Sequence, residues 1–164
     1  ALWGGGVHRP PPSVEWCAEV VTNVNVFSGA FERQLDDKGR LALPSKLRID
    51  LGERVYLTKG FDRSVTVVPE ETFRAEASRL AARVETGDAD RDDMRALMWS
   101  AVVVTLDKQG RVTLDETLRH YAGIGPLSAV VVAGSYDRLE IWHPDVYAER
   151  AAAGTARRAG ASAR

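Results

Sequence analysis

The chain has 164 residues, a formal net charge of −1, 45% hydrophobic residues and 27% charged residues, which is the composition of a globular protein. The near-zero charge disfavours a protein that coats nucleic acid nonspecifically, and the sequence contains neither a membrane-length apolar run nor an export signal. One cysteine, Cys17, excludes an internal disulfide, and no Cys/His cluster has zinc spacing, so we expect a cytoplasmic protein without a structural metal.

Residues 1–25 differ in composition from the rest of the chain. They contain Gly4-Gly5-Gly6 and Pro10-Pro11-Pro12 and show no sustained hydrophobic period. Such a composition is typical of disordered segments. This stretch is therefore predicted to form a disordered arm.

Two copies of one short motif follow this arm. Asp36-Asp37-Lys38-Gly39-Arg40 recurs in the second half of the chain as Asp107-Lys108-Gln109-Gly110-Arg111. The same offset in residue number, which we call the repeat offset, carries Leu35, Leu43, Leu47 and Arg48 onto Leu106, Leu114, Leu118 and Arg119. Further on, Asp62-Arg63 recurs as Asp137-Arg138 at a slightly larger offset, so a short insertion lies between. The chain is a duplicated module, and since each half has too little apolar surface to fold alone, we expect one shared core.

Each half predicts the same order of elements: strand, glycine turn, strand, short helix, strand, turn, strand and helix. Runs of β-branched and aromatic residues around turn residues predict a hairpin in each half. The hairpins are strands 55–58 and 65–68 around turn 60–63, and strands 129–133 and 139–142 around turn 135–138. Pro69 and Pro144 then begin helices, because proline is tolerated in the first turn of a helix.

Apolar residues at helical spacing follow the first hairpin. One stripe is Phe73, Ala77, Leu80, Ala81 and Val84, and a second segment, 91–100, brings together Met94, Leu97 and Met98. Such stripes usually pack on the protein's own sheet, and a subunit interface is the alternative. At the end of the chain, residues 152–164 have no large apolar residue and are predicted to form a disordered tail.

The repeated motif has the residues of a tight turn. Glycine permits positive φ at positions 39 and 110, and Asp36 and Asp107 can accept hydrogen bonds from turn amides. A turn does not require the arginine that follows in both copies, so we interpret Arg40 and Arg111 as side chains that project from a rigid support. A guanidinium can bond O6 and N7 of guanine in a major groove. Because surface arginines are common, the residues alone leave nucleic-acid contact open.

The stretch Phe27-Ser28-Gly29-Ala30-Phe31, residues 35–48 and residues 106–111 resemble the MraZ transcriptional regulators, which belong to the wider AbrB-like swapped-hairpin family. The similarity covers residues 26–151. It implies an α+β fold: a tandem AbrB-like swapped-hairpin β-barrel built from two internal repeats, with helices following each half. Residues 26–100 would form the first repeat with its helices, and residues 101–151 the second repeat.

The resemblance also implies a sequence-specific DNA-binding transcriptional regulator. It would assemble into a homo-oligomeric ring and bind G-rich direct repeats upstream of its own gene, which heads a division and cell-wall gene cluster. The expected partners are double-stranded DNA and further copies of the chain, in the cytoplasm and at the nucleoid, with no cofactor, small-molecule substrate or membrane. The expected DNA-binding residues are Arg40 and Arg111, with Lys38 and Gln109 beside them, and Lys46 and Arg48, of which Lys46 would contact phosphate.

Two features set the second copy apart from the first. Asp115 stands where the family often has a proline matching Pro44. In addition, residues 105–119 sum to zero charge, whereas residues 34–48 sum to +2. We therefore expect the first turn to be the stronger DNA contact.

The resemblance bears on residues 1–25 as well. Family members typically begin at the position of Val26, and an internally translated GTG start codon would give valine. Residues 1–25 are therefore either a genuine disordered arm or an untranslated leader. The codons of Trp3-Gly4-Gly5-Gly6 and Val14-Glu15-Trp16 are G-rich, so such a leader would contain the operator. Mass spectrometry of the native N-terminus separates the two, since peptides from before Val26 would exclude a leader.

Two other classes of function compete with DNA reading. An enzyme is disfavoured because His8, His120 and His143 do not recur in the other half and no serine or cysteine lies in a nucleophile motif, so we expect no catalytic residue. The other class is an antitoxin-like AbrB-type module that binds a protein and does not read DNA sequence. The neutral second turn favours this module, and the repeated arginine opposes it.

Overall fold

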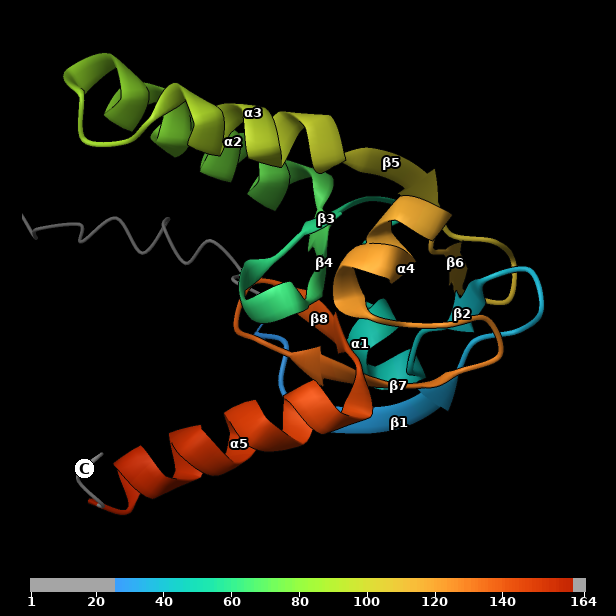
Figure 1. Cartoon of the computed structure of the whole chain (residues 1–164). Coiled ribbons are helices and arrows are strands. Elements are labelled where there is room, and N and C mark those ends of the chain that lie inside the picture. The colour runs from blue at the N-terminus through green and yellow to red at the C-terminus, as the bar shows by residue number, and fades with distance from the viewer. Residues whose placement is uncertain (1–25, 161–164) are drawn as a thin grey trace, which may run out of the picture.

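The computed structural model describes residues 26–160 and has a mixed α+β architecture with an antiparallel sheet (Figure 1). Both interpretations of residues 1–25 concern a segment outside the described residues. The described strands are β1 (Ala30–Gln34), β2 (Arg40–Ala42), β3 (Arg54–Lys59), β4 (Val65–Pro69), β5 (Val102–Thr105), β6 (Arg111–Thr113), β7 (Ala129–Gly134) and β8 (Leu139–Trp142). The described helices are α1 (Ser45–Arg48), α2 (Glu70–Thr86), α3 (Arg91–Ser100), α4 (Glu116–Ala122) and α5 (Pro144–Arg158), with a 3₁₀ turn, η2, at Phe61–Arg63.

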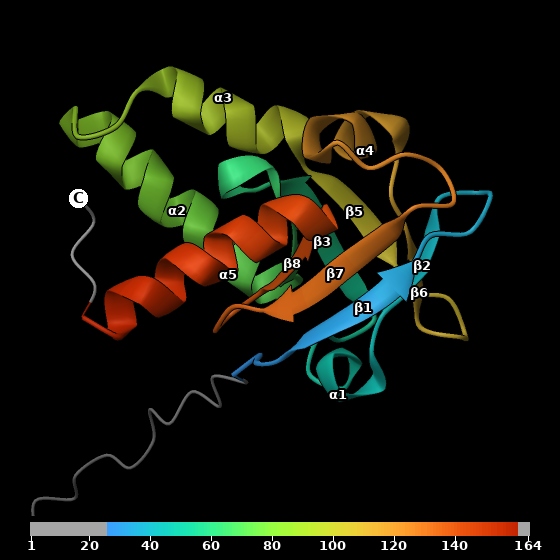
Figure 2. The ribbon, with the colours of Figure 1, turned by 60° about the horizontal axis from the view of Figure 1, so that its bottom comes forward.

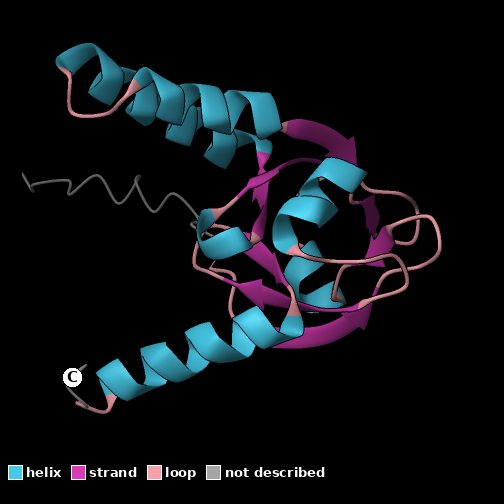
Figure 3. Cartoon of the chain, viewed as in Figure 1, coloured by secondary structure: helices cyan, strands magenta, loops and turns pink. Residues whose placement is uncertain are grey.

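The predicted order of elements recurs in both halves (Figure 3). The first half runs β1, turn, β2, α1, β3, turn, β4 and α2, and the second runs β5, turn, β6, α4, β7, turn, β8 and α5. Among the described elements, α3 alone stands outside this order. The hairpins β3–β4 and β7–β8 are antiparallel pairs, as the runs of β-branched residues predicted.

The two halves interleave in one sheet. Its strand order is β1-β7-β8-β4-β3-β5, so β1 of the first half pairs with β7 of the second, and β3 pairs with β5. A separate two-stranded ladder joins β2 to β6. The hydrogen-bonded order of the large sheet ends at β1 and β5, and these two strands do not pair with each other.

Both halves contribute to one apolar core, as the repeat predicted. The fully buried side chains include Leu41, Leu57, Val67, Val112, Val132, Leu139 and Ile141. Burying such a side chain stabilises the folded chain by about 1.5–3 kcal/mol relative to leaving it in water. Because both halves supply strands to one sheet and side chains to one core, separating the halves would expose these residues to water.

Each helix begins where the sequence offers a suitable residue. Pro69 precedes α2 and Pro144 lies in the first turn of α5, as predicted. Asp115 begins α4, and its carboxylate accepts a hydrogen bond from the Leu118 amide at 2.8 Å. Pro44 begins α1 at the corresponding place in the first half. Proline and aspartate both start a helix there, so Asp115 does not disturb the second half.

Two expectations about the helices need correction. Helix α5 continues to Arg158, whereas residues 152–164 were expected to form a disordered tail. Alanine and arginine have high helix propensity, which extends the helix without apolar burial. In α2, only Phe73 of the predicted apolar stripe is buried, where its ring stacks on Tyr56 with 4.1 Å between the centroids. The rest of the stripe is less deeply covered.

The three long helices and the small ladder lie at opposite ends of the molecule. Helices α2, α3 and α5 extend toward one side, and β2 and β6 lie at the other, in both views (Figure 1, Figure 2). The end that carries β2 and β6 is therefore not covered by the long helices. Among the described helices, none combines the length and apolarity needed to cross a bilayer.

Candidate nucleic-acid interface

The first turn, residues 36–40, is organised by one carboxylate. Asp36 Oδ1 accepts hydrogen bonds from the amides of Lys38 at 2.9 Å and Arg40 at 2.8 Å. The Gly39 amide donates to the Asp36 carbonyl at 3.2 Å, and Gly39 has a φ of 73°, where a Cβ is unfavourable. The turn folds locally as predicted, since the aspartate fixes the amides and the glycine reverses the chain.

The second turn, residues 107–111, repeats this geometry. Asp107 Oδ1 accepts hydrogen bonds from the amides of Gln109 and Arg111, both at 2.9 Å. The Gly110 amide donates to the Asp107 carbonyl at 2.9 Å, and Gly110 has a φ of 70°. The two turns are one structural unit used twice.

The arginine of each turn belongs to the turn itself. Arg40 Nε donates to Asp36 Oδ2 at 2.6 Å, and Arg111 Nε donates to Asp107 Oδ2 at 2.7 Å. The interpretation that the turn has no use for the arginine was wrong, because the guanidinium reaches back to the aspartate at the start of the turn. The bond engages Nε and leaves the two terminal nitrogens for another partner. The arginine side chains are 32% and 27% exposed, so that partner can come from solvent.

The same contacts keep both aspartates charged. Burial alone would raise the pKa of Asp36, but hydrogen bonds from the Arg40 amide and guanidinium and from the Lys38 amide outweigh it and lower that pKa. Hydrogen bonds from the Arg111 amide and guanidinium lower the pKa of Asp107 in the same way. Each arginine is therefore held against a fixed anion at neutral pH.

The two turns meet in the ladder of β2 and β6, which we call the central ribbon. Leu41 faces Val112 at its centre, and both side chains are buried. Side chains alternate along a strand, so the opposite face carries Arg40, Ala42, Arg111 and Thr113. Arg40 pairs with Thr113 and Ala42 with Arg111, which makes the arginines diagonal neighbours about 7–8 Å apart. A two-stranded ribbon of this kind fits a DNA major groove.

Backbone hydrogen bonds tie each half to the turn of the other half. The Leu43 amide donates to the Gly110 carbonyl at 3.1 Å, and the Leu114 amide donates to the Gly39 carbonyl at 2.9 Å. The two turns therefore hold one fixed arrangement relative to each other. A change that loosens one turn reaches the second through this shared ladder.

Two further arginines add hydrogen bonds beside the two turns. Arg48 Nη1 donates to the Gln109 carbonyl at 2.7 Å, and its side chain lies across Gly110. Its repeat partner Arg119 donates from Nε to the Leu114 carbonyl at 3.2 Å and lies close to Gly39. The sequence interpretation did not include Arg119 among the site residues, although the repeat offset that relates it to Arg48 was the signal that could have found it.

The remaining predicted DNA-binding residues are exposed. Lys38 and Gln109 lie at the tips of the two turns, and Lys46 lies on α1, the short helix that follows β2. The structure thus brings together Arg40, Arg111, Lys38, Gln109 and Arg48 on and around the central ribbon. Lys46 is placed on the adjoining helix.

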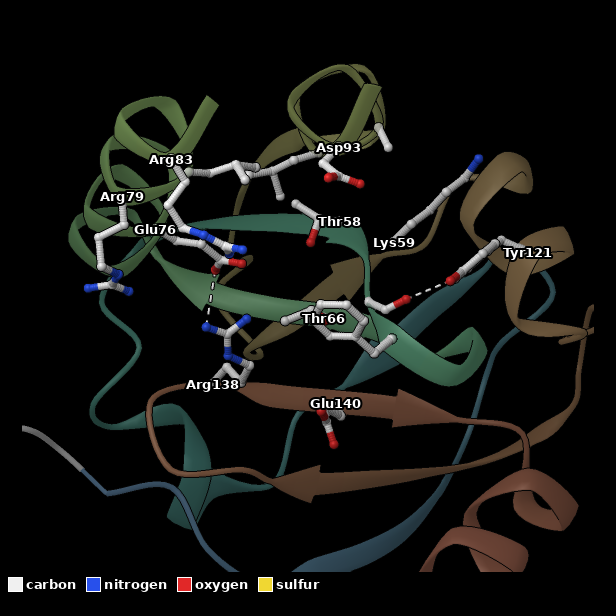
Figure 4. A pocket seen from close by; sticks show the side chains of 15 residues that line it. Thr58, Lys59, Thr66, Glu76, Arg79, Arg83, Asp93, Tyr121, Arg138 and Glu140 are labelled. Atoms are coloured by element: carbon white, nitrogen blue, oxygen red, sulfur yellow. Dashed lines mark hydrogen bonds and ion pairs between the residues drawn. The ribbon is translucent and has the colours of Figure 1, made fainter. Parts of the chain in front are cut away.

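A cavity of about 730 Å³ lies beneath α2 and α3, away from the ribbon (Figure 4). Its lining residues come from β3, β4, β8, α2, α3, α4 and the turns that follow β3 and precede β8. Arg138 bonds Glu76 Oε2 at 3.1 Å, and the Tyr121 hydroxyl donates to the Gly60 carbonyl at 2.5 Å (Figure 4). These contacts pair several of the cavity's polar groups with one another.

The histidines that were weighed as catalytic candidates have ordinary positions where they can be described. His143 begins α5, and its Nδ1 accepts a hydrogen bond from the Asp145 amide at 3.1 Å. His120 is exposed on α4, and His8 lies outside the described residues. Within residues 26–160, no group of His, Cys, Asp and Glu side chains could hold a metal ion.

These features define the class of the protein: a duplicated α+β protein whose interleaved halves present a shared ribbon with two arginines. A family model described as MraZ protein, putative antitoxin-like, matches residues 26–95 and 97–157. The chain belongs to the MraZ family, as the resemblance predicted.

Relatives named transcriptional regulator MraZ support a regulator of transcription rather than an enzyme. The relative from Corynebacterium glutamicum strain R is 44% identical over 123 residues, which cover 75% of this chain and 85% of the relative. The relative from Corynebacterium jeikeium is 40% identical over 127 residues, covering 77% and 87%. The relative from Nocardia farcinica is 44% identical over 117 residues, covering 71% and 80%.

Proposed function

We propose that the protein is a sequence-specific DNA-binding transcriptional regulator that reads G-rich direct repeats upstream of its own gene, in a division and cell-wall gene cluster. The observation that carries this proposal is the central ribbon. It presents Arg40 and Arg111 on one outward face, while Leu41 and Val112 anchor the other face in the core. Major-groove width matches a two-stranded ribbon, and guanine is the base that arginine pairs with best.

Each arginine is prepared for this contact before DNA arrives. Asp36 and Asp107 hold the Nε atoms, so the terminal nitrogens of Arg40 and Arg111 point from a fixed base. Those nitrogens can donate together to O6 and N7 of guanine. Because the side chains are already ordered, less conformational entropy is lost on binding.

The residues around the ribbon have supporting roles in this proposal. Lys38 and Gln109 extend the reading face at the turn tips. Lys46 and Arg48 contact backbone phosphates, which position the protein without specifying sequence. Arg48 also keeps its hydrogen bond to the Gln109 carbonyl, so it fixes the second turn.

The proposal includes assembly. The exchange of β1 onto β7 and of β3 onto β5 supports a tandem swapped-hairpin barrel with repeats at 26–100 and 101–151. Several copies in a head-to-tail ring would present identical ribbons to successive direct repeats. Linking sites in this way raises avidity by roughly 10²- to 10⁴-fold without a new contact, which offsets the net charge of −1. The ring works in the cytoplasm, associated with the nucleoid.

A gel shift with the DNA upstream of the gene, at one stated salt concentration, tests this function. We expect specific retardation by the wild type, and weaker retardation with loss of guanine preference for Arg40→Ala. An equal loss on specific and random DNA would show that Arg40 does not read bases. No preference of the wild type for the upstream DNA over random DNA would reject sequence-specific binding.

One observation favours the second candidate, an antitoxin-like module that binds a protein. Two aromatic side chains near the helical end, Phe61 and Trp99, are 86% and 82% exposed, and Phe61 lines the cavity. Exposed aromatic residues are frequent anchors of protein interfaces. Trp99→Ala would weaken a protein complex and leave intrinsic ribbon–DNA contacts unchanged, so gel shifts and pull-downs on this variant separate the two candidates.

A further inference from the structure

The central ribbon is nearly symmetric, and this conflicts with reading direct repeats. Its approximate dyad passes between Leu41 and Val112 and exchanges the Arg40 turn with the Arg111 turn. A reading head with perfect dyad symmetry binds a site equally well in both orientations. Such a head could not distinguish a direct repeat from an inverted one. Any polarity of the ribbon must therefore come from positions where its two halves differ.

Within the central ribbon and its turns, residues 36–42 and 107–113, three exposed pairs of positions differ between the halves. Each pair is related by the repeat offset, and they are Asp37 and Lys108, Lys38 and Gln109, and Ala42 and Thr113. By contrast, the residues that build the turns are the same in both copies, namely the aspartate that accepts the amides, the glycine and the arginine. Apart from the buried Leu41 and Val112, the differences between the two halves of the ribbon thus lie on its exposed side.

The pair Ala42 and Thr113 lies beside the two arginines of the ribbon. Ala42 lies directly across the ribbon from Arg111, and Thr113 lies directly across from Arg40. All four side chains share the outward face, because Leu41 and Val112 turn inward. Each arginine therefore faces the DNA together with one cross-strand neighbour. Beside Arg111 this neighbour is Ala42, which offers a methyl group. Beside Arg40 it is Thr113, which offers a methyl group and a hydroxyl.

We propose that these unlike pairs orient the ribbon on DNA, so that each chain reads a non-palindromic step in one direction only. This inference rests on the proposed function. The Arg40 end combines a guanine contact with a hydroxyl at Thr113 that can donate or accept at the neighbouring base. The Arg111 end combines a guanine contact with the Ala42 methyl, which suits a thymine methyl group.

The side chains at the turn tips, Lys38 and Gln109, also make the two ends of the ribbon different. Lys38 brings a positive charge to the Arg40 end, where it can contact guanine or phosphate. Gln109 brings an amide to the Arg111 end, where it can bond N6 and N7 of adenine together. The turns use the backbone amides of Lys38 and Gln109, so the side chains can differ without altering the turns. The two ends of one ribbon thus require different bases.

Two variants make the ribbon symmetric in opposite ways. The first copies the first half onto the second, with Lys108→Asp, Gln109→Lys and Thr113→Ala, and the second copies the second half onto the first, with Asp37→Lys, Lys38→Gln and Ala42→Thr. The first variant lowers the net charge by one and the second raises it by one. A shared effect of the two variants therefore cannot arise from charge.

The probes are duplexes that carry two copies of the upstream repeat, either in direct order or with one copy inverted, at one salt concentration. We expect the wild type to prefer the direct order by roughly 5- to 150-fold, the discrimination of one good bidentate base contact. Both symmetric variants should bind the two duplexes with a ratio near one. Circular dichroism confirms that each variant is folded.

The outcomes separate this inference from the proposed function. Variants that still prefer the direct order overturn the inference, while specific binding by the wild type keeps the proposed function. A wild type that binds specifically but treats both duplexes alike also overturns the inference. If a triple variant loses DNA binding, the single variant Thr113→Ala tests the inference instead. It should lower the ratio of affinities for the direct and inverted duplexes. An unchanged ratio would reject the inference. Failure of the wild type to bind either duplex specifically rejects the proposed function itself.

Discussion

The first and second turns are alike where they face the protein and unlike where they face solvent. Asp36 and Asp107 accept hydrogen bonds from the corresponding amides of their own turns. They also accept hydrogen bonds from the arginine Nε atoms at 2.6 and 2.7 Å. The exposed neighbours differ, with Lys38 in one turn and Gln109 in the other. Duplication therefore preserved the framework of the turn and left its surface chemistry to diverge. A change to the framework should affect both turns, and a change to the surface should affect only one.

The largest expected effect is on the free energy of unfolding, and it comes from changing the buried centre of the ribbon that both turns share. Leu41 is fully buried at the centre of the ribbon, so Leu41→Ala should lower the free energy of unfolding by about 2–5 kcal/mol. Urea unfolding measures this loss. Lys38→Ala, at an exposed position of the same turn, is the control and should change stability by no more than about 0.5 kcal/mol. Equal effects of the two changes would mean that the ribbon centre is not part of the core.

The next effect compares the reading arginines. Arg40→Ala should cost about 1–3 kcal/mol of DNA binding per engaged site and relax the preference for guanine. Arg111→Ala should cost less, because residues 105–119 carry no net charge whereas residues 34–48 carry +2. Fluorescence anisotropy with specific and scrambled duplexes measures both variants. A larger loss for Arg111→Ala would reverse our ranking of the turns.

The glycines sharpen the comparison at the level of the backbone. Gly39 and Gly110 both have positive φ, so an alanine at either place should cost about 1–2 kcal/mol of stability. The neighbours differ: a Cβ at 39 would lie 3.0 Å from the Leu114 carbonyl, whereas a Cβ at 110 would displace the Arg48 side chain. Thermal unfolding gives the common cost. Because only Gly110→Ala displaces Arg48, only this variant should lose salt-dependent DNA binding. Equal DNA binding by the two variants would contradict a role of Arg48 in contacting DNA.

A smaller effect should distinguish α1 from α4. Lys46 is exposed and, as a phosphate contact, should contribute about one unit to the salt slope of DNA binding. Lys46→Ala should reduce the slope and leave the sequence preference unchanged. Thr117 is its partner at the repeat offset, so Thr117→Ala is the matched control and should leave the slope alone. A changed base preference in Lys46→Ala would assign this lysine to base reading.

The smallest effect is the acid response of the turns. Hydrogen bonds lower the pKa of Asp36 and Asp107 below the ordinary value of 3.8. The charged carboxylates therefore stabilise the folded chain above the unfolded-state pKa, and this contribution is lost as the pH falls through the lowered values. The double variant Asp36→Asn with Asp107→Asn should lose less stability than the wild type below about pH 4. Identical acid unfolding of the two proteins would show that these carboxylates are not coupled to folding.

Local signals were enough to predict much of the fold from the sequence. Glycine, aspartate and proline act within a few residues, so the turns, the hairpins and the starts of α2 and α5 were found where expected. The return bond from Arg40 to Asp36 was missed, since spacing alone does not show which way a side chain turns. The Arg48 contact with Gln109 joins residues that are far apart in sequence, and no local pattern encodes such a contact.

The long helices were the least predictable region. An apolar stripe on α2 predicted core packing, yet the helix stands beside a cavity and buries only Phe73. A stripe reports which side chains are apolar but not how closely another element approaches them. The repeat marked the positions of the two turns, because Asp36, Gly39 and Arg40 recur at one fixed offset, whereas contact of these turns with DNA stays a prediction.

Replacement of the guanines in the upstream repeats by 7-deazaguanine tests the central claim most directly, because it removes only the N7 acceptor and keeps base pairing. The wild type should bind the modified duplex more weakly, because each arginine loses one of its two hydrogen bonds to guanine. The double variant Arg40→Ala with Arg111→Ala should bind the modified and unmodified duplexes equally, which closes a double-mutant cycle between arginine and N7. An equal loss in both proteins, or no loss in the wild type, would contradict the claim that these two arginines read guanine.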